Sequence, residues 1–193
     1  KPDYDLNNFS GKLKPEIWTA LNTDKKNPLF NRATQTRYPP GSTYKMVSAL
    51  ASLQEGILKT NSTIPCEGSF RFGDKLFGDH GAFGSITIPT AIEHSSNVFF
   101  YKLVLRIGLD NWNKYGQMLG FGHKTGIDIP EETKGLLPST EYYNKRYGAT
   151  GWTQGYVVSL GIGQGELGVS PLQMALYTSI LSNSGTFNQP HLV

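Results

Sequence analysis

A double proline followed by glycine, Pro39-Pro40-Gly41, is the feature that most constrains how this chain can fold. Such a run ends any helix or strand and forms a turn. Directly after it, from Ser42 to Glu55, apolar residues recur at helical spacing, and Gly56 marks an end. The sequence therefore predicts a turn that leads straight into a helix and presents Ser42 at the helix N-terminus.

Lys45 follows Ser42 by three residues, so the two side chains share one face of the predicted helix. A serine hydroxyl is a weak nucleophile until a neighbouring base takes its proton. Lys45 can be that base only when it is neutral, which requires burial or positive neighbours to lower its pKa from about 10.4. The alternative is that Ser42 is only a helix cap, which the four-residue pattern alone favours. The preceding turn favours an exposed nucleophile.

A second polar cluster, Ser95-Ser96-Asn97, falls on a predicted helix from about Ile88 to Arg106 or just before the apolar core of that helix. Ser95 could relay a proton between Lys45 and a leaving amine. Asn97 offers both a donor and an acceptor to a substrate amide. A polar helix face is the alternative, and the tripeptide alone favours it.

Weaker patterns predict the other elements. Residues 57–85 are expected to be loop with short strands, and residues 121–155 irregular, so strands are too few for a self-sufficient sheet. We predict further helices at Glu16–Leu21 and Asn111–Leu119 and after the Ser170-Pro171-Leu172-Gln173 capping box, and a short strand at Val157–Leu160.

Composition excludes several classes of protein. The 193 residues are 38% hydrophobic and 17% charged with a net charge of +3, which suits one globular domain or a large piece of one. The sequence lacks the basic stripe that nucleic-acid binding requires. It also has no apolar run that reaches the ~20 residues of a membrane span. Because the chain opens at Lys1-Pro2-Asp3 without Met, we expect an excised piece whose membrane anchor lies elsewhere.

The motifs around Ser42 and Ser95, in this order, resemble those of class B penicillin-binding proteins, most closely the elongation type, penicillin-binding protein 2. The resemblance covers nearly the whole chain. It is carried by Pro28-Leu29-Phe30-Asn31-Arg32-Ala33, Tyr38-Pro39-Pro40-Gly41-Ser42-Thr43-Tyr44-Lys45, His94-Ser95-Ser96-Asn97-Val98-Phe99-Phe100-Tyr101, Leu119-Gly120-Phe121-Gly122, Gly161-Ile162-Gly163-Gln164-Gly165 and Ser170-Pro171-Leu172-Gln173-Met174-Ala175.

The resemblance implies an α/β (α+β) fold of the penicillin-binding-protein and serine β-lactamase type, with residues 1–193 as the central, mainly helical part of one transpeptidase domain. The family's third box, Lys-Thr-Gly on a sheet-edge strand, normally follows the Gly161–Gly165 stretch, which we interpret as a turn near the active site. Lys124-Thr125-Gly126 matches its letters but precedes that stretch, and we expect it to be a decoy. The first sheet strands, the third-box strand and the C-terminal helix are then missing, and we expect the chain alone to be inactive.

The resemblance also implies a mechanism. Ser42 would attack the penultimate D-alanine carbonyl of a peptidoglycan stem peptide ending in D-Ala-D-Ala, with Lys45 as base, Ser95 as proton shuttle and Asn97 as substrate holder. β-Lactams would trap Ser42, and no cofactor is required. The implied place is the periplasmic face of the bacterial inner membrane. The implied partners are a SEDS-type glycosyltransferase and an elongation scaffold protein such as MreC.

A structural zinc site is a further hypothesis. Cys66, Asp79, His80 and His94 are all acceptable zinc ligands, and a closed site takes four. Elongation-type relatives often carry Cys, Asp and His in this loop, but their later Cys is replaced here by Ser96, and His94 is the substitute. The alternative is a lone buried cysteine beside surface Asp and His side chains.

Two other functions stay open at the level of sequence. One is a β-lactam-binding sensor or a non-catalytic scaffold module of the same fold. The other is a serine β-lactamase, which needs a base to activate water for hydrolysis of the acyl-enzyme. No motif for that base is found, and the Pro39-Pro40-Gly41 turn and the Gly161–Gly165 stretch favour the transpeptidase.

Overall fold

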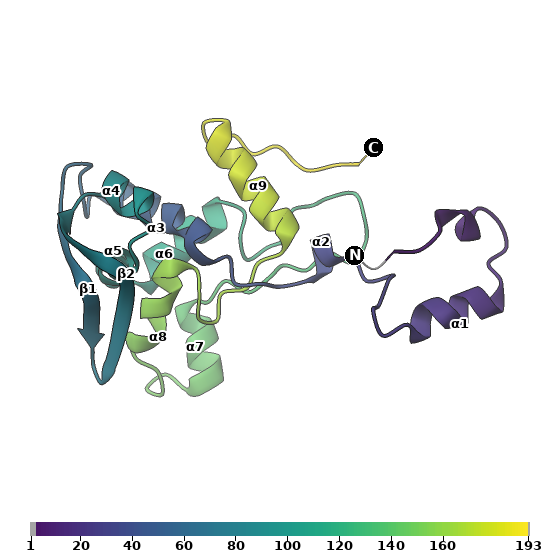
Figure 1. The fold of residues 1–193 in the computed structure, drawn as a ribbon, viewed down its shortest axis with the longest axis horizontal. Coiled ribbons are helices and arrows are strands. Elements are labelled where there is room, and N and C mark those ends of the chain that lie inside the picture. The colour runs from purple at the N-terminus through teal and green to yellow at the C-terminus, as the bar shows by residue number, and fades with distance from the viewer. Residues whose placement is uncertain (1–2, 193) are drawn as a thin grey trace.

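The computed structural model describes residues 3–192; Lys1, Pro2 and Val193, on which the expectation about the chain's ends depends, lie outside the described residues. Among the described residues the strands form one antiparallel hairpin, which lies at the left edge of Figure 1 beside the main group of helices, in agreement with the predicted α+β class. With η marking a 3-10 helix, the elements in chain order are η1 (Leu6–Phe9), α1 (Pro15–Thr23), α2 (Arg32–Gln35), η2 (Gly41–Tyr44), α3 (Lys45–Gln54), β1 (Ile64–Phe72), β2 (Lys75–Ile86), α4 (Ile88–Glu93), α5 (Asn97–Ile107), α6 (Leu109–Met118), α7 (Thr140–Tyr147), α8 (Gly155–Val158), η3 (Ser159–Ile162) and α9 (Pro171–Ser182).

Helix α5 is the centre of the core. Val98, Phe99, Phe100, Leu103 and Val104 have no exposed surface. Helices α3, α6 and α8, the η3 turn and both strands pack around it. A helix that is apolar on nearly all sides is stable only when it is enclosed, and each such side chain contributes roughly 1.5–3 kcal/mol by burial. The first residues of α5 are therefore held in place by elements from the whole chain.

The hairpin of β1 and β2 is longer than the sequence predicts. Its register pairs Ile64 with Ile86 at one end and Phe72 with Lys75 at the turn, with irregularities on either side of Glu67. Ile64 and Cys66 point inward and are fully buried, whereas the residues between and after them are more exposed. Glycines and charged residues interrupt the apolar alternation in this segment, so the sequence predicts only short strands here.

The predicted helix Ile88–Arg106 is two helices, α4 and α5, and this correction matters for the site. His94, Ser95 and Ser96 separate them, and Ser95 has a φ of +52°. A left-handed residue cannot continue an α-helix. Ser95 therefore lies in a turn, and Asn97 is the first residue of α5 rather than part of a continuous helix face.

Two further predictions are wrong. Val157–Leu160, predicted as a strand, forms α8 and the start of η3, and its apolar residues are buried. A short buried apolar run has no periodicity that separates strand from helix. The region 121–155, expected to be irregular, contains α7, which Ser139 caps by accepting a hydrogen bond from Tyr142 N at 3.1 Å. Its polar composition gave no apolar stripe to detect.

The helices α1, α6 and α9 confirm their sequence predictions within a few residues. At α9 the capping box is complete: Ser170 Oγ accepts from Gln173 N at 3.1 Å and Gln173 Oε1 accepts from Ser170 N at 3.0 Å. The buried Gln173 also donates to the backbone oxygens of His123 and Lys134 at 2.8 and 3.0 Å. One side chain thus ties the 123–134 loop to the start of α9.

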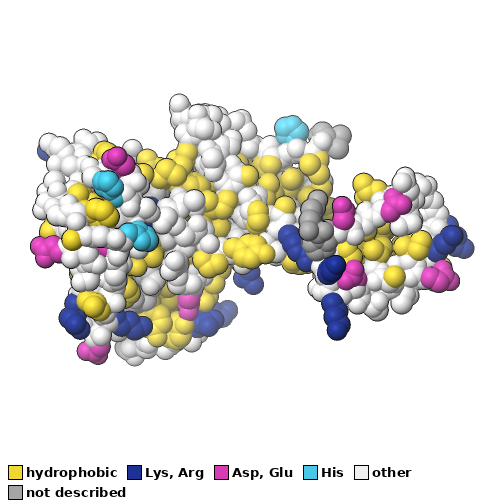
Figure 2. All heavy atoms as spheres, in the orientation of Figure 1, with side chains coloured by type: hydrophobic (Ala, Val, Ile, Leu, Met, Phe, Trp, Pro, Cys, Tyr) yellow, Lys and Arg dark blue, Asp and Glu magenta, His cyan; other side chains and the backbone are white. Residues whose placement is uncertain are grey.

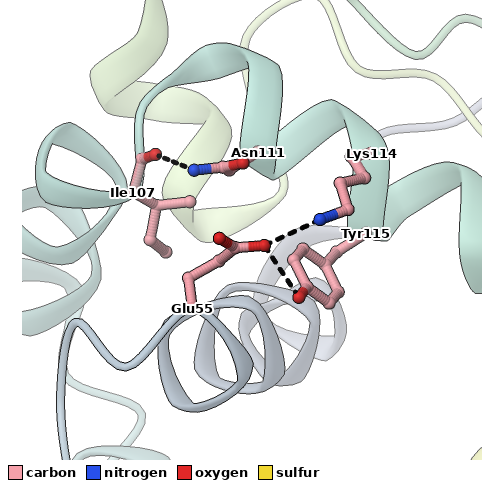
Figure 3. Close-up of polar contacts among 5 residues, drawn as sticks. All are labelled: Glu55, Ile107, Asn111, Lys114 and Tyr115. Atoms are coloured by element: carbon pink, nitrogen blue, oxygen red, sulfur yellow. Dashed lines mark hydrogen bonds and ion pairs between the residues drawn. The ribbon is translucent and has the colours of Figure 1, made fainter.

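An exposed carboxylate joins α3 to α6. Figure 3 shows Glu55, at the end of α3, accepting hydrogen bonds from Lys114 Nζ at 2.8 Å and Tyr115 OH at 2.9 Å. Asn111 Nδ2 donates to the oxygen of Ile107 at 3.3 Å and links α5 to α6. Helices α3 and α6 also pack against each other, and Trp112 of α6 has no exposed surface and lies against Tyr44, the residue before α3.

The N-terminal segment extends away from the rest of the described chain. Figure 1 shows η1 and α1 at one end, joined to the body through α2. Neither η1 nor α1 has a buried residue, and Leu6 and Trp18 are 73% and 50% exposed. Hydrophobic side chains are visible on this arm in Figure 2. Across residues 3–192, no helix combines the length and the apolar character that crossing a bilayer requires.

Candidate active site

Ser42 lies on the surface within the η2 turn, and Lys45 begins α3 directly after it. The helix predicted from Ser42 thus starts as a 3-10 turn. In that geometry residues three apart eclipse each other, which keeps Ser42 and Lys45 on the same face. Gly41 has a φ of +63°, and Thr43 Oγ1 donates to the oxygen of Pro40 at 2.8 Å. The Pro-Pro-Gly run therefore forms the tight turn that exposes the serine.

Segments from the C-terminal half of the chain hold this turn. Gly41 N donates to the oxygen of Gly163 at 2.9 Å, and Tyr177 OH donates to the oxygen of Thr43 at 3.3 Å. Gly163 has a φ of +69°, and a Cβ at this position would lie 2.1 Å from the oxygen of Gly41. The glycine-rich stretch at 161–165 is thus a packing element against the Ser42 turn, in agreement with its interpretation as a turn near the active site.

An aromatic cluster lies beneath the same turn. Tyr44, fully buried, is 5.2 Å from Trp112 and 5.1 Å from Phe121 between ring centroids, and Phe121 is 5.1 Å from Tyr177. Aromatic pairs of this kind contribute about 0.5–1.5 kcal/mol beyond their buried area. They hold Tyr44, one of the two residues between Ser42 and Lys45, and so stabilise the backbone that carries both side chains.

Lys45 joins the two predicted motifs. It is 2% exposed, and its Nζ donates to Ser95 O at 2.6 Å, Ser95 Oγ at 3.0 Å and Asn97 Oδ1 at 2.8 Å. The Phe100 ring lies 5.6 Å from the same nitrogen. Burial lowers the pKa of Lys45 to about 8, and the Asp79 carboxylate opposes this by raising it. Lys45, Ser95 and Asn97 therefore form one hydrogen-bonded group. The lowered pKa of Lys45 brings its amine closer to the pH range in which it can act as a general base.

Ser95 occupies a position that usually belongs to glycine. Ser96 N donates to the oxygen of Ala91 at 2.9 Å and Ser95 N to that of Ile92 at 3.1 Å. These two bonds with a left-handed residue form a Schellman motif, in which the left-handed position is normally glycine. A serine there costs on the order of 1–2 kcal/mol. Strained residues of this kind cluster at functional sites. Here the left-handed backbone at Ser95 positions its hydroxyl within hydrogen-bonding distance of Lys45 Nζ.

Asp79 is the site residue whose role the sequence analysis missed. Its carboxylate, on β2, accepts hydrogen bonds from Ser96 Oγ at 2.6 Å, Asn97 N at 2.8 Å and Val98 N at 2.9 Å. Asp79 and Asn97 are 18 positions apart in the chain, so no local sequence pattern connects them.

The four zinc candidates do not converge on one another in the part of the chain that the structure describes. Cys66 is buried, and burial raises the pKa of its thiol. The carboxylate of Asp79 is used by α5, His80 is exposed, and the ring of His94 stacks on Phe83 with centroids 5.1 Å apart. Within residues 3–192, no three His, Cys, Asp or Glu side chains converge as metal ligands would.

Lys124-Thr125-Gly126 lies in a loop and not on a strand. The carboxylate of Glu132 accepts from Thr125 N at 2.7 Å and from Gly126 N at 3.2 Å. The N–H groups of Thr125 and Gly126 therefore have partners within the chain. This geometry agrees with the interpretation of the tripeptide as a decoy.

Comparison with known proteins points to one family. Residues 1–193 match the family model "Penicillin binding protein transpeptidase domain". The peptidoglycan D,D-transpeptidase MrdA of Haemophilus influenzae is 39% identical over 199 residues, which cover all of this chain and 30% of that protein.

Two solved structures have the same fold. Penicillin-binding protein 2 of Helicobacter pylori, in a complex with MreC, has a TM-score of 0.89 at 35% identity over 98% of this chain and 36% of that one. A chain of a peptidoglycan synthase complex that coordinates polymerization and crosslinking has a TM-score of 0.88 at 32% identity, over all of this chain and 33% of that one. The chain thus spans about a third of the length of such relatives, and it belongs to the penicillin-binding protein transpeptidase family.

Proposed function

We propose that the protein containing this chain is a peptidoglycan D,D-transpeptidase that works through an acyl-enzyme on Ser42 in cell-wall elongation. The observation that carries the proposal is the group in which buried Lys45 contacts Ser95 and Asn97 while exposed Ser42 lies on the adjoining turn. The names of the relatives support it, since MrdA proteins are described as peptidoglycan D,D-transpeptidases.

In the proposed acylation, neutral Lys45 takes the proton of Ser42 Oγ as this oxygen attacks the carbonyl carbon of the penultimate D-alanine. The three hydrogen bonds of Lys45 use all three N–H donors of its charged form. Loss of one proton leaves a lone pair that can turn to Ser42. The tetrahedral intermediate then breaks its bond to the terminal D-alanine, whose nitrogen needs a proton.

Ser95 can deliver that proton, because its hydroxyl lies 3.0 Å from Lys45 Nζ. Proton transfer by a positioned group contributes about 10²–10⁴-fold to a rate. In the second half-reaction an acceptor amine attacks the acyl carbon and loses a proton along the same path. Ser42 Oγ leaves and regains its proton, which completes the cycle with a new peptide bond.

Asn97 is suited to hold the substrate peptide. Its Oδ1 accepts from Lys45, which fixes the orientation of the amide. Within residues 3–192 its Nδ2 group makes no hydrogen bond and can donate to a substrate carbonyl. We expect Asn97→Ala to weaken acylation through both effects.

The test is turnover of a synthetic stem peptide ending in D-Ala-D-Ala by a version of the protein extended past Val193, here called the extended protein. A transpeptidase releases D-alanine and forms a cross-linked dimer when an acceptor amine is present. A sensor or scaffold of the same fold is acylated by a β-lactam but forms no dimer. A serine β-lactamase releases hydrolysed β-lactam at a steady rate. Either of these last outcomes would replace the proposal.

The partners and the location follow from the same proposal. The Helicobacter pylori relative forms a complex with MreC, and another belongs to a peptidoglycan synthase complex. We propose that this protein likewise works with an elongation scaffold protein such as MreC and with a SEDS-type glycosyltransferase, at the periplasmic face of the inner membrane. Co-purification of the extended protein with the MreC of the same organism, compared with an unrelated periplasmic protein, tests this.

A further inference from the structure

Helix α5 begins without backbone partners for its first N–H groups, as every α-helix does. The carboxylate of Asp79, from the neighbouring strand β2, supplies them. Oδ1 accepts from Asn97 N at 2.8 Å, and Oδ2 accepts from Val98 N at 2.9 Å and from Ser96 Oγ at 2.6 Å. Oδ1 also accepts from His80 N at 2.8 Å. Each oxygen thus has two donors, and the negative charge lies at the positive end of the α5 dipole.

The residues held by Asp79 are those that hold Lys45. Asn97, whose N–H is bound by the carboxylate, uses its own side chain to accept from Lys45 at 2.8 Å. Ser95, which directly precedes Ser96, accepts two hydrogen bonds from Lys45 Nζ, one at its backbone oxygen and one at Oγ. A shift of α5 by a fraction of its pitch would break these contacts together, because the three acceptors lie within three residues.

We infer that Asp79 is a positioning residue of the active site: its carboxylate clamps the start of α5 so that Ser95 and Asn97 meet Lys45 at hydrogen-bonding distance. The inference rests on the proposed function of Ser42 and Lys45. Asp79 contacts neither the nucleophile nor the base through a hydrogen bond among the described residues, so it acts through the residues it orients.

The charge of Asp79 gives the clamp a second effect. Burial raises the pKa of Asp79, but the hydrogen bonds from Ser96, Asn97, Val98 and His80 lower it more, so the carboxylate stays ionised. It is the charged group that acts on Lys45, whose pKa it raises against the effect of burial. Loss of this charge would therefore move the pKa of Lys45 further down, which a purely structural residue elsewhere would not do.

The hydrogen bonds also distinguish this role from metal binding. N–H and O–H donors from two elements point at the carboxylate oxygens of Asp79. A cation bound to these oxygens would be repelled by the positive ends of the same donors. Of the other candidate ligands, Cys66 interacts through its thiol with the Ser96 hydroxyl. The side chain of Asp79 thus links β2 directly to the start of α5 through hydrogen bonds.

The experiment compares Asp79→Asn with Asp74→Asn in the extended protein. Asp74 lies at the exposed turn of the same hairpin, so its substitution removes the same charge without touching α5. We measure the rate constant for acylation by a fluorescent penicillin as a function of pH. For Asp79→Asn we expect the plateau rate to fall about 10²-fold, as a misplaced catalytic group does, and the pH midpoint to move lower. Asp74→Asn should match the unsubstituted protein.

An unchanged midpoint and rate in Asp79→Asn would overturn the inference. Ser96→Ala, which removes one donor to the carboxylate, serves if Asp79→Asn does not fold; it should slow acylation less, and no slowing at all counts against the clamp. Hydrogen exchange at the amides of Asn97 and Val98 gives a readout that needs no activity. Failure of acylation in the unsubstituted protein would sink the proposed function alone, while retained exchange protection in Asp79→Asn would sink the clamp alone.

Discussion

The side chains of Lys45 and Asn97 are joined by a hydrogen bond of 2.8 Å between Nζ and Oδ1, although 52 positions separate them in the chain. Lys45 is the first residue of α3, and Asn97 is the first residue of α5. The site is therefore assembled where two helix N-termini meet. The relative position of the Lys45 and Asn97 side chains therefore depends on the turns that precede the two helices, and several substitutions in those turns test this.

The first prediction concerns pH. Burial lowers the pKa of Lys45 to about 8. Only the neutral amine can take the Ser42 proton, so acylation should be slow below this pH and reach a plateau above it. The acylation rate constant measured from about pH 6 to about pH 10 should have its midpoint near 8. Lys45→Met should lower the plateau by about 10²–10⁴-fold. A rate that is flat over this range contradicts the role of Lys45 as base.

Ser95 is predicted to trade stability for activity. Ser95→Gly relieves the left-handed strain at φ +52°, whereas Ser95→Ala keeps the strain and loses the same hydroxyl. We expect Gly at this position to be more stable than Ala by about 1 kcal/mol in urea unfolding, while both variants acylate slowly. Equal stability of the two variants would show that the turn is not strained, and full activity of either would remove Ser95 from the proton path.

Gly163 is predicted to be required by the Ser42 turn. A Cβ there would lie 2.1 Å from the oxygen of Gly41 and 2.8 Å from Cβ of Tyr44. Gly163→Ala should cost about 2–4 kcal/mol from strain and overpacking together and should slow acylation of Ser42. Gly56→Ala is the control, since Gly56 has a similar φ of +66° but no atom within 4 Å of an added Cβ. If both variants lose the same stability, the close contact is not what matters.

Gln173 is predicted to stabilise the 123–134 loop. Gln173→Met keeps the approximate volume but leaves the oxygens of His123 and Lys134 and the N–H of Ser170 without this partner. We expect a loss of about 1–3 kcal/mol in the free energy of unfolding and faster hydrogen exchange in the loop. Gln164→Met, at an exposed position, should change neither quantity. Loss of stability in Gln164→Met but not in Gln173→Met would contradict the assignment.

Metal content is the subject of the last of these predictions. Because the Asp79 carboxylate is used by α5 and the ring of His94 stacks on Phe83, we expect no stoichiometric zinc in protein purified without a histidine tag. Addition of a chelator should leave the melting temperature unchanged. One zinc per chain, with a lower melting temperature after chelation, would restore the metal-site hypothesis for Cys66 and Asp79.

The nucleophile motif could be predicted from sequence because its causes are local. A turn at Pro39-Pro40-Gly41 and a spacing of three between Ser42 and Lys45 specify exposure and a shared face. The capping box at Ser170 is local in the same way, and α9 begins where it predicts. Such features depend on backbone rules that act within one turn of helix.

The rest of the site depends on contacts between distant segments. The break at Ser95 was missed because the apolar residues on both sides of it continue at helical spacing, and only a left-handed φ interrupts them. The role of Asp79 was missed because its partners lie on another element. The Val157–Leu160 run was assigned to a strand because burial, which decides its structure, has no short-range signal.

The most direct test of the account is covalent labelling of Ser42. The extended protein is incubated with a fluorescent penicillin, and intact mass with peptide mapping locates the adduct, with Ser42→Ala as the control. The account predicts one adduct per chain, on Ser42, that is absent from the control. A folded protein that takes no label, or that takes it equally in Ser42→Ala, would contradict the assignment of Ser42 as the nucleophile.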